Sequence, residues 1–118
     1  QTFQAWFEAT SDQIEKGNAA TALSDIEAKL DPSKFGNREP GMKFLLLELR
    51  GDALMKLDRC ADAEESYRLA QGNLSSAQFL FVRSDDKDPR EQMITESERN
   101  AQQARLDEKL SRASACAR

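Results

Sequence analysis

The residue types that most often carry enzyme chemistry are sparse in this sequence. It contains no histidine, which excludes a Ser-His-Asp triad, a Cys-His pair and the commonest general base. The two cysteines, Cys60 and Cys116, cannot supply the four ligands of a structural zinc site. Gly51 and Gly72 stand alone in helical contexts, so no glycine-rich phosphate-binding loop is present. We therefore expect a protein that is not an enzyme and that uses no cofactor and no metal.

An acidic cluster and the two cysteines are the remaining candidates for chemistry. Asp85, Asp86 and Asp88 lack the central glycine that a calcium-binding loop requires, so we interpret them as a solvated break with a helix cap. Two cysteines are too few for a disulfide framework, and we expect free thiols in a reducing compartment, which favours the cytoplasm. Cys60 beside Arg59 would be reactive if it were exposed at a helix N-terminus, although an isolated cysteine in a turn is more often incidental.

Length and charge limit the classes of partner. A chain of 118 residues predicts one domain, over residues 1–118. A net charge of −4 argues against nucleic acid, whose phosphates require a basic face. No apolar run approaches the roughly 20 residues that cross a bilayer, so we expect no membrane partner. The remaining class is a partner protein or peptide.

Hydrophobic periodicity predicts two helical hairpins. The first covers residues 2–30, where Gly17 and Asn18 end one helix and apolar positions recur at helical spacing in the next. Asp31-Pro32 ends that second helix, because the residue before a proline is pushed out of the helical region. The second hairpin covers residues 42–71 and is broken by a short polar turn near Cys60.

The last third of the chain predicts two more helices. Ser75 with Gln78 forms a capping box for a short helix over residues 75–83. Asp88-Pro89 then begins a long helix over residues 88–115. Because the apolar stripe of the long helix drifts around its axis, we expect this helix to be docked at its start and to project at its end.

The second hairpin carries a specific pattern of small and large residues: Leu47, Gly51, Leu54, Ala63, Tyr67 and Ala70. This pattern resembles the tetratricopeptide repeat. The first hairpin fits less well, since Thr10 stands where the family has a small residue. The resemblance implies an all-α fold of antiparallel helical hairpins, a TPR-like α-solenoid fragment, with a long C-terminal capping helix. The alternative is an ordinary helical bundle in which the small residues mark close helix crossings.

The resemblance also implies a function. In this family the first helix of each hairpin lines a groove, so the chain is expected to be a protein-protein interaction scaffold or adaptor that binds a peptide or helix of a partner protein. The partner-binding residues carried over are Phe7, Glu48, Asp52, Met55 and Lys56. The competing interpretation places Met55 in the core and makes the three charged residues a solvated, charge-paired stripe.

A second hypothesis is a self-associating structural module, which would form a homo-oligomer. Its basis is the run of four large apolar residues at 79–82, which cannot all face one core. The predicted assembly surface is Phe79, Phe81 and Val82, together with the C-terminal helix.

Overall fold

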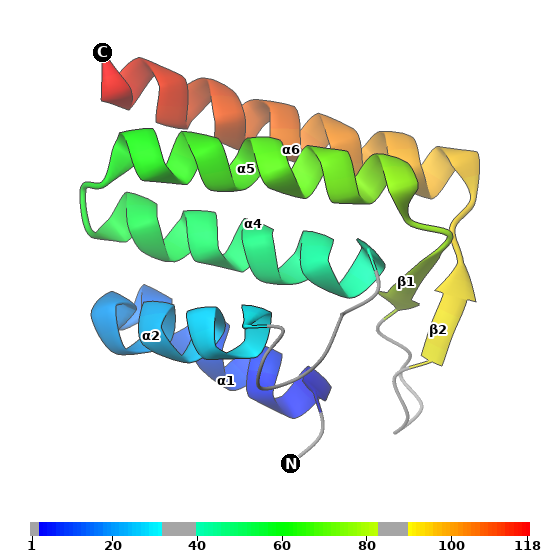
Figure 1. Cartoon of the computed structure of the whole chain (residues 1–118), viewed down its shortest axis with the longest axis horizontal. Coiled ribbons are helices and arrows are strands. Elements are labelled where there is room, and N and C mark those ends of the chain that lie inside the picture. Colours follow the sequence, from blue (N-terminus) through cyan, green and yellow to red (C-terminus); the bar gives the residue numbers. More distant parts are fainter. Residues whose placement is uncertain (1–2, 32–39, 83–89) are drawn as a thin grey trace.

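The computed structural model describes the backbone of residues 3–31, 40–82 and 90–118, and the side chains of these residues outside 79–92. The elements in chain order are α1 (Phe3–Glu15), α2 (Ala19–Leu30), α4 (Pro40–Lys56), α5 (Cys60–Ser76), β1 (Phe79–Val82), β2 (Arg90–Met93) and α6 (Glu96–Ala117). Helices α4, α5 and α6 lie beside one another as successive layers, and α1 and α2 lie on the other side of α4 (Figure 1). The β-hairpin lies at one end of this stack. The fold is all-α, as expected, because the helices build the core.

The first hairpin turns at Gly17, whose φ of +91° is readily available only to glycine. Helix α2 contacts α4 and brings Ala22 and Ile26, both 0% exposed, into the core. Thr10 stands at a position where the repeat pattern has a smaller residue. Its hydroxyl is satisfied locally, because Oγ1 donates to the carbonyl oxygen of Trp6 at 2.7 Å. A polar side chain is therefore buried here without loss of a hydrogen bond.

The second hairpin turns at Asp58, which has a left-handed φ of 58°. The backbone N–H of Arg59 donates to the carbonyl of Leu54 at 2.9 Å and so satisfies one of the last carbonyls of α4. Between α4 and α5 the backbones come close at Gly51. A Cβ atom built there would lie 2.7 Å from Cδ1 of Tyr67, so only glycine fits without displacing the ring.

The segment after α5 differs from the expectation. A short helix over residues 75–83 was expected, but α5 continues to Ser76 and residues 79–82 form strand β1. Strand β1 pairs antiparallel with β2 in the register Phe79 opposite Met93 and Val82 opposite Arg90. Four consecutive apolar residues fit a strand as well as a helix, and periodicity alone does not separate the two over so short a run.

The C-terminal helix begins later than expected. Residues 90–93 of the predicted 88–115 helix form β2, and α6 begins at Glu96. Its cap is Thr95, whose side chain accepts from the backbone N–H of Glu98 at 3.1 Å. The expected cap, Asp88, lies outside the described residues. Helix α6 does not project at its end, because Leu106 and Ala113 are both 0% exposed.

A disulfide bond joins Cys60, at the start of α5, to Cys116, in the last turn of α6. The expectation of two free thiols was therefore wrong. The two Cα atoms lie 5.7 Å apart, which is an ordinary separation for a disulfide. The antiparallel packing of α5 and α6 brings these ends together, although 56 positions separate the cysteines in sequence.

Candidate functional site

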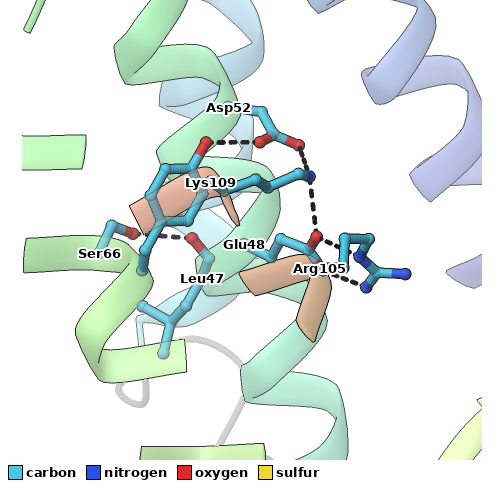
Figure 2. Close-up of polar contacts among 7 residues, drawn as sticks. Leu47, Glu48, Asp52, Ser66, Arg105 and Lys109 are labelled. Atoms are coloured by element: carbon cyan, nitrogen blue, oxygen red, sulfur yellow. Dashed lines mark hydrogen bonds and ion pairs between the residues drawn. The ribbon is translucent and has the colours of Figure 1, made fainter. Parts of the chain in front are cut away.

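Two acidic residues of α4, Glu48 and Asp52, lie one helical turn apart and both reach α6. Arg105 donates two hydrogen bonds to Glu48, from Nε to Oε2 at 2.7 Å and from Nη2 to Oε1 at 2.5 Å. Lys109 lies between the two acids, 2.8 Å from Oε2 of Glu48 and 3.1 Å from Oδ2 of Asp52 (Figure 2). Two carboxylates four residues apart on α4 thus face two cations four residues apart on α6.

Helix α5 contributes the third side of this arrangement. The hydroxyl of Tyr67 donates to Oδ1 of Asp52 at 2.6 Å. Next to it, Oγ of Ser66 donates to the carbonyl oxygen of Leu47 at 2.8 Å. We call Glu48, Asp52, Tyr67, Arg105 and Lys109 the Glu48 cluster. It joins α6 to α4 and α5, two neighbouring helices from which α6 is far removed in the sequence.

Burial changes the acidity of two groups in the Glu48 cluster. Loss of solvent raises the pKa of Asp52 above its ordinary value, against the opposing effects of Lys109 and of the Tyr67 hydrogen bond. Burial, and then the neighbouring Asp52 carboxylate, raises the pKa of Tyr67 well above its ordinary value. Tyr67 therefore keeps its proton and remains a donor to Asp52. With both acids engaged by cations, the Glu48 cluster is suited to holding helices together rather than to proton transfer.

The structure thus gives two of the predicted partner-binding residues a role inside the chain. The side chain of Glu48 is only 7% exposed, so burial beneath α6 replaces the expected exposure in a groove. Asp52 is 31% exposed and bonds to Lys109 and Tyr67. The competing expectation of a solvated stripe is equally wrong for Glu48. The charge of Glu48 is paired with Arg105 and Lys109 of α6, and the carboxylate is buried.

Of the other predicted partner-binding residues, Phe7 lies in α1, and Met55 and Lys56 lie at the end of α4. Phe7 and Met55 are half-buried and pack against the edge of the core. Lys56 is exposed, and its Nζ lies 3.9 Å from Oε2 of Glu15 at the end of α1. We call Phe7, Met55 and Lys56 the α1–α4 face. Phe79, Phe81 and Val82 belong to β1, and their side chains lie outside the described part of the chain, so the assembly surface stays a prediction.

Sequence reasoning missed Arg105, Lys109 and the pairing of the cysteines. One signal was available for the cations, because Arg105 and Lys109 have the same four-residue spacing as Glu48 and Asp52. It does not reveal which helices pack together, and that depends on the β-hairpin and the turn into α6.

Three observations complete the description. Within the described residues, no helix is long and apolar enough to cross a membrane. Nor do the described ranges, 3–31, 40–82 and 90–118, contain a group of three acidic or cysteine side chains placed to hold a metal ion. No protein-family model, no curated protein and no solved structure matches the chain.

Proposed function

We propose that this protein is an interaction module that binds a peptide or helix of a partner protein across the α1–α4 face. The observation that carries the proposal is the contact between Gly51 and the ring of Tyr67. It is the close helix approach that the tetratricopeptide resemblance assigns to these two positions. Ala63 and Ala70, both 0% exposed, allow α5 to pack as closely on either side of Tyr67.

The order in which the helices pack gives further support. Helix α2 contacts the first helix of the next hairpin, α4, and α5 in turn contacts α6 (Figure 1). In this proposal, α6 corresponds to the first helix of a third repeat. Its exposed residues are mostly polar, such as Asp107, Glu108 and Ser111, which suits a helix that closes an array.

The chemistry of the α1–α4 face indicates the kind of partner. Phe7 and Met55 offer half-buried apolar surface, on which an apolar anchor residue of a partner segment can pack. Lys56 is only loosely paired with Glu15, since their side chains are 51% and 71% exposed and their closest atoms are 3.9 Å apart. A carboxylate of the partner can therefore replace Glu15 beside Lys56 with little loss of binding free energy. We expect a segment with one large apolar residue near an acidic one.

Selection from a random peptide library displayed on phage tests this proposal. Peptides enriched on the wild-type protein should lose affinity by at least about tenfold for Phe7→Ser and for Lys56→Glu, which corresponds to about 1.4 kcal/mol. Leu69→Ser is the matched control, because Leu69 is a large apolar residue of α5 that is 48% exposed and lies outside the α1–α4 face. Enriched peptides that bind all four proteins equally, or a selection that yields none, would refute the proposal.

Self-association is the second candidate, and one observation favours it. Met93, the last residue of β2, is 72% exposed, and in the part of the chain that the structure describes its sheet has two strands. Large exposed apolar side chains at a sheet are often covered by another subunit. Light scattering on the wild-type protein and on Met93→Lys separates the candidates. A dimer that becomes monomeric on substitution supports assembly, whereas a monomer in both cases leaves the α1–α4 face as the proposed site.

A further inference from the structure

The two halves of the Cys60–Cys116 disulfide differ in their access to solvent. Cys60 is 6% exposed, whereas Cys116 is exposed near the end of α6. A hollow of 320 Å³ borders the disulfide and is lined by residues from the start of α5, the preceding turn and the end of α6. Because Cys116 as a residue is exposed and Cys60 is buried, we expect a small molecule in this hollow to reach Cys116 more readily than Cys60.

The two halves also differ as leaving groups. Cys60 is the first residue of α5, where unpaired backbone N–H groups and the helix dipole stabilise a negative charge. Cys116 lies in the last turn of α6, where the carbonyl end of the helix disfavours one. A thiolate leaves a disulfide faster when its negative charge is better stabilised. Access and leaving-group stability thus favour the same direction of attack.

We propose that the Cys60–Cys116 disulfide is a thiol-exchange site at which a small cationic thiol becomes attached to Cys116. The incoming thiol loses its proton to solvent, and its thiolate attacks Sγ of Cys116. A new disulfide forms between the two while the Cys60–Cys116 bond breaks, and the electron pair of that bond leaves on Sγ of Cys60. The incoming sulfur is oxidised and the sulfur of Cys60 is reduced, so no further oxidant is needed.

The charge of the preferred thiol follows from the lining of the hollow. Arg59 donates from Nε and from Nη2 to Oδ2 of Asp62, at 3.0 and 2.9 Å, so these two charges offset each other. Asp58 also lines the hollow and, within the described residues, makes no ion pair. One carboxylate is thus left to attract a positively charged thiol and to repel an anionic one.

The first experiment identifies which sulfur is attacked. The folded, oxidised protein is incubated briefly with cysteamine, quenched at low conversion with acid and N-ethylmaleimide, and mapped by peptide mass spectrometry. We expect cysteamine on Cys116 and maleimide on Cys60 in at least about fivefold excess over the reverse, a ratio that the difference in leaving groups supports. Equal amounts of the two products, or an excess of the reverse, would overturn the proposal.

The second experiment tests the charge preference. Exchange rates with cysteamine, 2-mercaptoethanol and 2-mercaptoethanesulfonate are divided by the thiolate concentration and compared at low ionic strength. We expect the rates to decrease in that order, with roughly two- to fivefold between the cationic and the anionic thiol, and the difference to shrink in high salt. Equal rates for all three thiols would refute a role for the hollow.

A matched pair of variants assigns that preference to Asp58. Asp58→Asn keeps the left-handed turn, since asparagine tolerates a positive φ, and it should remove most of the preference for cysteamine. Asp25→Asn removes an exposed acid of α2, outside the hollow, and should leave the preference unchanged. A preference that persists in Asp58→Asn, or that is lost equally in both variants, contradicts the assignment.

Discussion

At the residue scale, one methyl group added at Gly51 should lower the stability of the fold markedly. In Gly51→Ala the new Cβ would lie 2.7 Å from Cδ1 and Cζ of Tyr67, and we expect displacement of the ring to weaken its hydrogen bond to Asp52. Overpacking of this kind costs about 1–3 kcal/mol, which exceeds the roughly 1 kcal/mol that alanine gains over glycine in a helix. We expect a lower urea midpoint for Gly51→Ala.

Gly72 provides the control for this prediction. It lies within α5, and a Cβ built on it meets nothing within 4 Å. Gly72→Ala should therefore stabilise the protein by about 0.5–1 kcal/mol, because only the helix propensity changes. If both substitutions shifted the urea midpoint in the same direction, the close approach of α4 and α5 at Tyr67 would not be the cause.

The two acids of the Glu48 cluster should respond differently to loss of charge. Glu48→Gln leaves Arg105 and Lys109 without their shared carboxylate in a half-buried place, which should cost about 1–3 kcal/mol. Asp52→Asn removes a carboxylate that burial already disfavours, and the amide oxygen still accepts from Tyr67. We expect its cost to stay below about 1 kcal/mol in urea unfolding at neutral pH. Equal costs for the two variants would contradict this ordering.

The raised pKa of Asp52 also predicts a pH dependence. Because the folded protein binds this proton more tightly than the unfolded chain, whose carboxyl has the ordinary value of 3.8, protonated Asp52 stabilises the fold below that pH. This stabilisation is lost as the pH rises through the pKa of the folded state. The stability of the wild type relative to Asp52→Asn should therefore fall with rising pH in this window and then level off. Urea unfolding at a series of pH values measures it. A difference that rises with pH would mean that Lys109 outweighs burial.

At the scale of elements, α6 is positioned from its first turn by Thr95 and Arg99. Thr95 caps α6, and the guanidinium of Arg99 donates to the carbonyls of Leu74 and Ala77 near the end of α5. Thr95→Ala should cost about 1 kcal/mol and Arg99→Ala about 1.5–3 kcal/mol, the latter because two half-buried carbonyls lose a charged donor. Thermal unfolding measures both. Ser97→Ala, at an exposed position of the same turn, is the control and should change little.

The elements that the sequence predicted well are those with long periodic patterns. Helices α1, α2, α4 and α5 could be located because apolar residues recur over three or more turns, and the contact of Gly51 with Tyr67 confirms a close crossing. Strand β1 was missed because Phe79–Val82 is too short to show a period, and its partner, β2, is polar. The start of α6 was misplaced because Asp88-Pro89 and Thr95 with Glu98 both read as helix starts.

At the scale of the whole molecule, the features that sequence could not supply are contacts between distant segments. Glu48 and Lys56 are both charged residues of α4, yet the side chain of Glu48 is buried against α6 and that of Lys56 is exposed. The difference depends on where α6 lies, which the β-hairpin and the turn at Thr95 determine. The disulfide also could not be predicted from the sequence alone. The spacing of two cysteines does not reveal their pairing until α5 and α6 are known to be antiparallel neighbours.

The disulfide should therefore control how firmly the last layer of the molecule is attached. It closes a loop over 56 positions, and its removal in Cys60→Ala/Cys116→Ser should lower stability by about 2–4 kcal/mol. In addition to this global loss, the last turns of α6 should open locally, because the Glu48 cluster and Leu106 still hold the middle of the helix. Hydrogen exchange should accelerate most in residues 110–117 and least in α2. Wild-type protein treated with dithiothreitol should match the double variant. Uniform acceleration in every helix would instead mean that the disulfide stabilises the fold as a whole and does not specifically prevent opening of the last turns of α6.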